Sequence, residues 1–317
     1  MSKYPLVSVI SVNYNQSQVT CDMIASLKKV TYPNVEIIVV DNASPSDNPE
    51  VIKQAYPEVN LIKSSINLGY AGGNNLGIAQ AKGEYLLFLN NDTEVEQNFI
   101  EPLVELFETN GQAGIASPKI LYYYSDRIIQ YAGSNGINAW TGRSITIGSL
   151  EKDQGQHDVS APTQLADGAA MMVPMRVIKE VGLMPEMYFL YYEELDWCEM
   201  IKRAGYTCHY VAGSTIYHKE SISVGKESVL KAYYMNRNRL LFIRRNIKGW
   251  QFLTSSTVFL LAAVPKKAVE YSLKLKGKHL KALIKGLLWN ASHFQVHGTK
   301  RYVPMPADQL EIKNALV

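Results

Sequence analysis

A regular alternation of short apolar runs with helix-like segments constrains this chain more than any other feature. Up to about His218, five β-branched or apolar runs begin 24 to 29 residues apart. They are Leu6 to Val12, Val35 to Val40, Val59 to Ile62, Tyr85 to Leu89 and Gly114 to Ser117. Between them, apolar residues fall on one helical face, as Val19, Met23 and Leu27 do. Because this spacing is typical of β-α-β units, we predict an α/β fold with a mostly parallel sheet and helices on both faces.

The composition agrees with a packed globular domain. Of 317 residues, 47% are hydrophobic and 19% are charged, which is enough apolar material for a core and argues against disorder. The three cysteines, Cys21, Cys198 and Cys208, form no closely spaced pair. This pattern argues against a disulfide framework or a structural zinc site and favours the reducing cytoplasm. The N-terminus lacks the pattern of a secretory signal.

The second part of the chain is basic. From Lys226 to Lys300 there are fifteen lysines and arginines against Glu227 and Glu270, a local net charge of +13, whereas the whole chain carries +3. We therefore divide the chain into a domain of residues 1–225 and a basic, amphipathic helical tail of residues 226–317. We expect one helix of the tail to stop at Pro265 and another to run from Lys266 to Trp289.

We expect this tail to bind an anionic membrane surface, because basic and apolar residues alternate along it. The longest apolar stretch, Phe252 to Val264, has thirteen residues, too few to cross a bilayer, which takes about 20. We therefore predict peripheral attachment at the inner face of the cell membrane and no spanning helix. A nucleic-acid surface and helices packed on the core are the alternatives; we expect no nucleic acid, and a homo-oligomer stays open.

Within the first part, a stretch rich in Gly, Asn and Ser from Gly133 to Thr163 breaks the alternation. We predict an irregular segment there.

Polar residues follow three of the predicted strands. Asn13 to Asn15, Asp41 to Ser44 and Asn90 to Asp92 stand where parallel strands would end. Each set alone is explained by helix capping or a turn. Three sets at one edge indicate a ligand site, since ligands of open parallel sheets bind beyond the carboxyl ends of the strands.

The segment Asn67 to Gly77 is rich in glycine and precedes a predicted helix. Free N–H groups at a helix start attract phosphate, so this segment is a candidate phosphate site. It does not match G-x-G-x-x-G, which argues against a nicotinamide cofactor. Glycines that let a helix pack tightly are the alternative.

Seven motifs follow one another along the chain: Val7 to Asn15, Val39 to Ser44, Asn67 to Gly77, Phe88 to Asp92, Asp167 to Ala169, Tyr191 to Asp196, and Tyr217 with His218. In their order and spacing, these motifs resemble the family 2 glycosyltransferases, which have a GT-A fold. The resemblance covers about Pro5 to His218, and the Asn67 to Gly77 segment is similar to that of a rhamnosyltransferase-like subgroup.

The resemblance implies a nucleotide-sugar site at the strand ends. Val12, Tyr14 and Asp41 would line the base and ribose pocket, with Asp41 accepting from the imide N–H of uracil or thymine. The other implied nucleotide-sugar contacts are Asn67, Gly69, Asn75, Asn91 and Asp167. Trp197 would stack on sugar or, equally, belong to the core.

The same resemblance implies a divalent cation, Mn²⁺ or Mg²⁺. Asn90, Asn91 and Asp92 stand in place of the family's Asp-x-Asp, with Asn90 replacing the first acid, so Asp92 would be the carboxylate ligand. His218 matches a histidine that completes the metal site in the family. One carboxylate is chemically sufficient when phosphates supply further oxygens.

Three acids, Glu193, Glu194 and Asp196, open a predicted helix after an aromatic run. One explanation is structural, since the helix dipole favours acids in the first turn. The other is catalytic, since a carboxylate in a partly apolar setting can act as a general base. In the family the second acid of a Glu-Asp pair takes the acceptor proton. That position is Glu194 here, with Asp196 as second choice and Glu193 as third.

The implied reaction is inverting, metal-dependent transfer of a sugar from a nucleotide diphosphate. Rhamnose from dTDP-rhamnose is our first prediction, with a saccharide or lipid-linked acceptor in bacterial surface polysaccharide synthesis. The alternatives are a UDP-sugar donor, carrying glucose, N-acetylglucosamine or galactofuranose, and a catalytically silent homologue that acts as a binding or assembly subunit.

Overall fold

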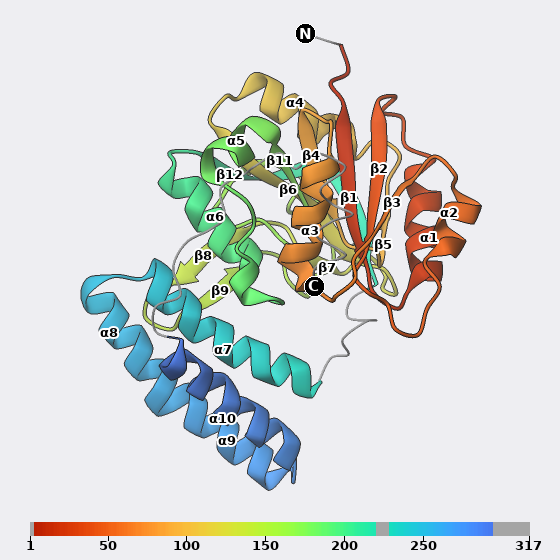
Figure 1. Cartoon of the computed structure of the whole chain (residues 1–317). Helices are drawn as coiled ribbons and strands as arrows, with labels where there is room; N and C mark the ends of the chain where they lie inside the picture. The colour runs from red at the N-terminus through yellow and green to blue at the C-terminus, as the bar shows by residue number, and fades with distance from the viewer. Residues whose placement is uncertain (1–2, 220–227, 294–317) are drawn as a thin grey trace.

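The core of the protein is one large sheet. The structure, a computed structural model, describes residues 3–219 and 228–293. Ten strands form a sheet with the order β10-β12-β6-β11-β4-β1-β2-β3, with β5 paired to β12 and β7 to β6 (Figure 1). The strands β1 to β4 are mutually parallel, and β6 is parallel to β12. The predicted α/β fold with a mostly parallel sheet is therefore confirmed.

The strands and helices alternate along the chain as predicted. The strands are β1 (Val7–Asn13), β2 (Val35–Asp41), β3 (Asn60–Lys63), β4 (Tyr85–Leu89), β5 (Thr93–Val95), β6 (Ala113–Tyr122), β7 (Ile129–Tyr131), β8 (Ser134–Asn138), β9 (Arg143–Thr146), β10 (Ala161–Thr163), β11 (Ala170–Pro174) and β12 (Thr207–His218). The helices are α1 (Ser17–Leu27), α2 (Glu50–Ala55), α3 (Gly69–Gln80), α4 (Ile100–Thr109), α5 (Met175–Val181), η1 (Glu186–Tyr188), α6 (Glu193–Arg203), α7 (Val229–Asn246), α8 (Gly249–Val258), η2 (Phe259–Ala263), α9 (Val264–Leu273) and α10 (Gly277–Ser292).

Helices cover both faces of the sheet and bury its alternating side chains. Val9 of β1 packs in one apolar cluster with residues of α1 and α4, whereas Ile10 packs in a second cluster with residues of α3, α5 and α6. A Cβ atom at Gly77 of α3 would lie 2.4 Å from Ile10 Cγ2. This glycine therefore lets α3 approach β1 closely, as the packing interpretation of the glycine-rich segment requires.

The stretch from Gly133 to Thr163 is more ordered than we predicted. It contains the antiparallel pair β8–β9 and the edge strand β10. The strands are short, and the β8–β9 register shifts between Ser134 and Ile137, which hides the alternating pattern that marks a strand.

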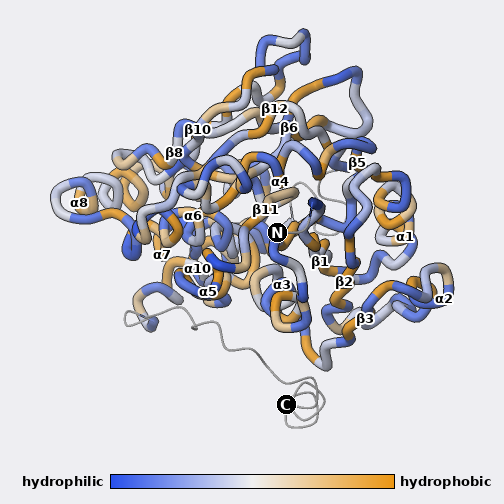
Figure 2. Tube along the Cα trace, turned by 90° about the horizontal axis from the view of Figure 1, so that it is seen from above, coloured by the Kyte–Doolittle hydropathy of each residue, from blue (hydrophilic) through white to orange (hydrophobic). Residues whose placement is uncertain are grey.

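The helices α7 to α10 form a layer beside the sheet domain, with α7 between that domain and the other three (Figure 1). The predicted stop at Pro265 is wrong, because α8, η2 and α9 form one continuous helix, Gly249–Leu273, of 25 residues. The π-helical turn η2, which ends at Ala263 two residues before Pro265, provides the local adjustment that a proline inside a helix needs. Helix α8 lies at the outer edge of the molecule (Figure 2).

The apolar helix is also longer than the thirteen residues we counted. Within residues 3–219 and 228–293, Gly249–Leu273 is the one helix long and apolar enough to cross a membrane by length and composition. The prediction that no segment reaches this length is therefore wrong. Polar Thr and Ser side chains interrupt the apolar run in the sequence but not the helix, since Ser255 is buried and its hydroxyl bonds the carbonyl of Gln251.

Candidate active site

A pocket of about 280 Å³, here called the strand-end pocket, opens at the carboxyl ends of β1, β2, β4 and β12. Because these strands run in one direction, the polar residues that follow them gather at one edge. The predicted residues that line the pocket are Val12, Tyr14, Asn67, Gly69, Asn91, Asp92 and His218. Asn42, Tyr70 and Tyr191 also line it, although we had assigned none of them a role individually.

Three predicted nucleotide-sugar contacts lie outside this pocket lining: Asp41, Asn75 and Asp167, the last of which lines a second pocket described below. Asp41 is buried, and its Oδ1 accepts hydrogen bonds from Asn13 Nδ2 at 2.8 Å and Ser44 Oγ at 2.5 Å. Asn75 is turned toward Met184, donating to its carbonyl at 3.0 Å and accepting from its N–H at 3.1 Å. Asn42, the neighbour of Asp41 in the sequence, lines the pocket instead. Its place directly after the strand β2 could have marked it as a pocket residue.

The start of α3 is not arranged to bind phosphate. The N–H groups of its first turn bond protein oxygens: Leu68 to Asn42 Oδ1 at 2.9 Å, Gly69 to Asn67 Oδ1 at 2.9 Å, and Tyr70 to the Phe189 carbonyl at 2.7 Å. The interpretation as a helix-start phosphate site is therefore wrong, because these donors are occupied. Gly69 has φ +70°, and a Cβ there would lie 2.1 Å from the Phe189 oxygen, so only glycine fits.

Asp92 and His218 face each other in the strand-end pocket. His218 pairs with Thr93 across β5 and β12, which brings its ring beside Asp92. His218 Nε2 lies 3.1 Å from Asp92 Oδ1, and Nδ1 donates to Gln130 Oε1 at 2.9 Å. The Gln130 bond orients the ring and leaves Nε2 to face the carboxylate, which is how a metal-ligating histidine is held.

This pair fits a divalent cation with few protein ligands. Among the residues that the structure describes, no group of three His, Cys, Asp or Glu is placed to hold a metal. A cation at Asp92 and His218 would therefore depend on other oxygens, such as those of a diphosphate.

A strained aromatic loop separates this pocket from the acidic cluster. Phe189, Tyr191 and Tyr192 have φ of 65°, 70° and 79°, which costs of the order of 1–3 kcal/mol for each non-glycine residue. Asn238 of α7 holds the loop, since its Nδ2 donates to the carbonyls of Tyr188, Leu190 and Tyr191 at 3.0, 2.8 and 2.8 Å. No local pattern in the sequence marks Asn238 for this role.

A second pocket of about 200 Å³, here called the Glu194 pocket, lies on the other side of Tyr191, which lines both pockets. Asp167 and Glu194 line it. Burial, together with the charge of Asp167, raises the pKa of Glu194 to about 7. Gly168 adjoins this acid, since a Cβ there would lie 3.4 Å from Glu194 Cγ, in ordinary van der Waals contact. A carboxylate with this pKa is suited to general base catalysis near neutral pH.

The other acids of α6 have different surroundings. Asp196 is fully buried, and its oxygens accept from Arg245 Nε and Asn246 Nδ2, both at 2.7 Å. It lines neither pocket, so its contacts favour a structural role. Glu193 is also buried, and burial with the charge of Glu194 raises the pKa of Glu193 well above its usual value.

Trp197 belongs to the core, as one of our two alternatives had it. Its side chain is fully buried, and its Nε1 donates to the Gly182 carbonyl at 3.0 Å.

Residues 8–180 match the family model for glycosyl transferase family 2. The chain belongs to this family. Among relatives of this glycosyltransferase, the low-salt glycan biosynthesis hexosyltransferase Agl10 of Haloferax volcanii is 27% identical, over 84% of this chain and 87% of that protein. The N-acetylglucosaminyl-diphospho-decaprenol L-rhamnosyltransferase of Mycobacterium tuberculosis is 24% identical, over 77% and 86%. The dTDP-rhamnosyl transferase RfbF of Shigella flexneri is 25% identical, over 89% and 95%.

Solved structures confirm the GT-A fold of this glycosyltransferase. The mannosyltransferase PcManGT from Pyrobaculum calidifontis, in complex with GDP-Man and Mn²⁺, aligns with a TM-score of 0.56 and 16% identity, over 99% of this chain and 80% of that chain. The Staphylococcus aureus protein TarS aligns with a TM-score of 0.57 and 14% identity, over 89% of this chain and 49% of that chain. At these identities the likeness concerns the fold alone.

Proposed function

We propose that this glycosyltransferase is inverting and metal-dependent, and that it transfers rhamnose from dTDP-rhamnose to a saccharide or lipid-linked acceptor in surface polysaccharide synthesis. The observation that carries the proposal is the pair of adjoining pockets. One holds Asp92 and His218, the other holds Glu194, and Tyr191 lies between them. The names of two relatives, both rhamnosyltransferases, support the choice of sugar.

The chemistry of this proposal divides between the two pockets. Asp92 and His218 would hold Mn²⁺ or Mg²⁺, which stabilises the negative charge of a departing diphosphate. Glu194 removes the proton from an acceptor hydroxyl, whose oxygen attacks the anomeric carbon from the side opposite the diphosphate. The new carbon–oxygen bond forms as the bond to the diphosphate breaks, so the configuration inverts and no covalent enzyme intermediate is needed.

A UDP-hexose donor is the second candidate, because the relative named a hexosyltransferase carries a name that is not restricted to rhamnose. Both pyrimidine bases present an imide N–H, so polar residues such as Asn42 and Asn67 suit either base.

Calorimetry of nucleotide binding with Mn²⁺ or with EDTA, followed by a turnover assay, tests the proposal. We expect dTDP-rhamnose to bind and turn over only with the cation. Asp92→Asn should abolish metal-dependent binding, while Asp126→Asn, a matched change at an exposed acid, should have no effect. Turnover of UDP-hexose alone would select the second candidate. If the protein binds donors but turns none of them over, the proposal fails and the alternative of a catalytically silent homologue is supported.

We also propose that the protein works at the cytoplasmic face of the membrane, attached through the helix Gly249–Leu273. Leu253 and Leu261 on this helix are exposed, while Lys266 and Lys267 add positive charge in its second half. Exposed apolar side chains beside lysines suit an interface with anionic lipid.

Sedimentation of the full-length protein with vesicles tests this attachment. We expect binding to vesicles that contain phosphatidylglycerol, weakened by salt and by Leu261→Asp. Val159→Asp, a comparably exposed position on the sheet domain, is the control and should keep the binding. Indifference to both lipid charge and Leu261→Asp would reject the attachment, and resistance to salt with release only by detergent would indicate a spanning helix instead.

A further inference from the structure

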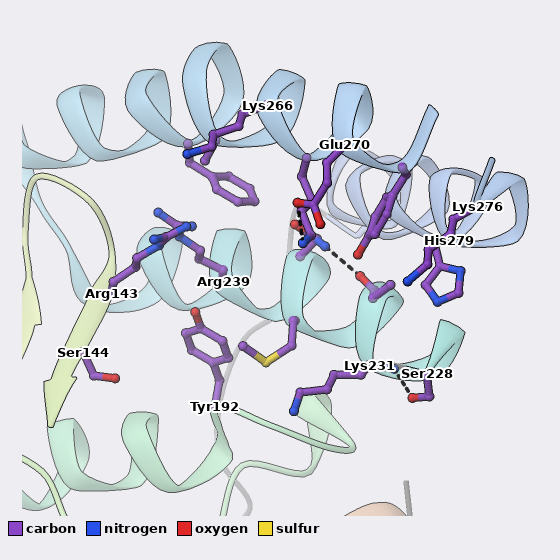
Figure 3. Close-up of a pocket in the computed structure, with 17 residues that line it drawn as sticks. Arg143, Ser144, Tyr192, Ser228, Lys231, Arg239, Lys266, Glu270, Lys276 and His279 are labelled. Atoms are coloured by element: carbon purple, nitrogen blue, oxygen red, sulfur yellow. Dashed lines mark hydrogen bonds and ion pairs between the residues drawn. The ribbon is translucent and has the colours of Figure 1, made fainter. Parts of the chain in front are cut away.

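A third cavity, of about 600 Å³, lies between α7, the helix Gly249–Leu273, the start of α10 and the strand β9. We call it the basic cavity. Figure 3 shows side chains from all these elements directed into it. None of the roles proposed above uses this space.

The cavity has an excess of positive charge. Its cationic lining residues are Arg143, Lys231, Arg239, Lys266, Lys267 and Lys276, and the one lining carboxylate among the described residues is Glu270. Glu270 is already paired with Lys267 at 2.8 Å and with Lys274 at 3.0 Å. No acid of the described chain forms an ion pair with Arg143, Arg239 or Lys266. The unmatched charges therefore face the cavity.

Arg239 is the most informative of these residues. It is only 7% exposed, yet its Nε has no hydrogen-bond partner in the described structure. Another guanidinium nitrogen donates to the Thr141 carbonyl, and the group lies 4.6 Å from the centre of the Phe259 ring. Burial lowers the pKa of Arg239, against an opposing effect of Tyr192, and the charge of Arg143 also lowers it. Figure 3 shows the two guanidinium groups side by side near Tyr192.

The buried guanidinium of Arg239, with the like charge of the more exposed Arg143 acting on it, is costly unless an anion lies beside it. A buried charge without a partner is strongly unfavourable, as is a buried donor without an acceptor. Phosphate groups match guanidinium geometry and accept several hydrogen bonds at once.

The position of the cavity indicates which phosphate it would bind. Ser144, Tyr192 and Met235 line both the basic cavity and the Glu194 pocket. No residue is shared with the strand-end pocket, where the donor diphosphate is proposed to bind. An anion beside Arg143 and Arg239 therefore lies on the acceptor side.

One wall of the cavity is also the apolar helix. Phe259, Lys266 and Tyr271 of this helix line the cavity, while Leu261, Val269 and Leu273 of the same helix are exposed. A molecule with a phosphate head and a hydrocarbon chain would find both of its parts matched here.

From these observations we propose that the basic cavity binds the diphosphate of a lipid-linked acceptor, with Arg143 and Arg239 as its principal ligands and the lipid chain directed toward the exposed residues of Gly249–Leu273. This inference rests on the proposed function, because it takes Glu194 to mark the acceptor side.

The experiment uses the full-length protein, EDTA to remove cations, and farnesyl diphosphate as the probe. Calorimetry should show binding of farnesyl diphosphate but not of farnesol. Since a hydrogen bond to a charged group contributes about 1.5–3 kcal/mol, Arg143→Gln should weaken binding by at least roughly tenfold. Arg143 is exposed, so this change should leave the fold intact. The double variant Arg143→Gln with Arg239→Gln should bind more weakly still.

Lys285→Gln is the matched control, because it removes one charge from α10 outside the cavity. We expect it to keep the affinity for farnesyl diphosphate. Unchanged binding in Arg143→Gln, or equal losses in Lys285→Gln, would overturn the inference. Vesicles of phosphatidylglycerol separate the two sources of phosphate: if their binding depends on Arg143 as strongly as that of farnesyl diphosphate, the cavity takes membrane headgroups and the acceptor assignment fails.

A final measurement separates this inference from the proposed function. Binding of dTDP with Mn²⁺ should be unchanged in Arg143→Gln, because the strand-end pocket is distinct. If the wild-type protein binds no nucleotide, the proposed function fails by itself. If nucleotide binding is normal and farnesyl diphosphate binding ignores Arg143, the inference fails alone.

Discussion

The strand-end pocket and the Glu194 pocket share Tyr191 but are supported in different ways. The first is formed mainly at the ends of β1, β2, β4 and β12, in a sheet whose side chains are buried on both faces. The second follows a loop with three aromatic residues at positive φ, which Asn238 of α7 holds through its carbonyls. A rigid sheet edge is suited to hold the diphosphate of the proposed donor in one position. The position of Glu194 on the proposed acceptor side depends instead on the loop, and therefore on α7, which holds that loop.

The helical layer is therefore part of the site and not only an appendage. Leu230 of α7 lines the strand-end pocket, and Met235 lines the Glu194 pocket. Arg245 and Asn246 of the same helix bind Asp196 in α6. One alternative that we gave for the tail was a set of helices packed on the core. For α7 this alternative is correct. The boundary at residue 225 stays a prediction, because residues 220–227 and 294–317 lie outside the described structure.

The largest expected effect comes from Glu194→Gln. Loss of a general base should lower turnover by roughly 10²–10⁴-fold without weakening donor binding. Initial rates measure the loss of turnover, and calorimetry of donor binding measures whether the affinity of the strand-end pocket is unchanged. Asp196→Asn is the comparison. If it lowers turnover more than Glu194→Gln does, the base has been assigned to the wrong residue.

The second prediction concerns the brace between α7 and the loop. Asn238→Leu removes the donor for three carbonyls, and we expect the free energy of unfolding to fall by about 1–3 kcal/mol. Turnover should fall as well, because the loop leads into Glu194. Donor affinity should also fall, because Leu190 and Tyr191 of the same loop line the strand-end pocket. Denaturant unfolding and initial rates measure both effects.

Asn236→Leu is the matched control on the same helix, since the Asn236 side chain donates to the Ala232 carbonyl within α7. Because Asn236 also lines the basic cavity, it serves as a control for stability only. If Asn236→Leu loses as much stability as Asn238→Leu, the helix as a whole would be responsible and not the brace.

These two pockets also differ in how far the sequence could predict them. Asp92 and Tyr14 follow strands directly, so the strand pattern was enough to place them at one edge. Glu194 was predicted from its motif. The residue that holds the loop before it, Asn238, was not predicted, because it lies more than forty residues further along the chain. Arg143 lies in a stretch that we predicted to be irregular. Such contacts depend on tertiary packing, for which neither periodicity nor spacing provides a signal.

The third prediction uses pH to examine the acceptor side. With the pKa of Glu194 near 7, kcat/KM should rise about tenfold for each pH unit below 7 and level off above it, because only the ionised acid accepts a proton. Asp167→Asn removes a charge that raises this pKa, so the rising limb should move to lower pH. Asp126→Asn should leave the limb in place. A limb that stays fixed in Asp167→Asn would show that another group controls it.

The smallest effect is expected from Glu193→Gln, and it concerns stability. Glu193 is 2% exposed, and its Oε2 has no hydrogen-bond partner among the described residues. Burial raises its pKa in the folded protein above the value in the unfolded chain. Above the unfolded pKa, the folded state therefore keeps a proton that the unfolded state has lost, and stability falls as the pH rises through this window.

The glutamine side chain of this variant cannot ionise, so the loss of stability with rising pH is absent. We expect Glu193→Gln to melt a few degrees higher than the wild type at pH 8 and at nearly the same temperature at pH 5. Asp196→Asn should do the opposite and lower the melting temperature at pH 8, because Asp196 is equally buried but accepts hydrogen bonds from Arg245 and Asn246. Thermal unfolding at the two pH values measures both variants. A gain in Glu193→Gln that is the same at pH 5 and pH 8 would mean that the buried acid does not titrate, and that the variant acts through packing alone.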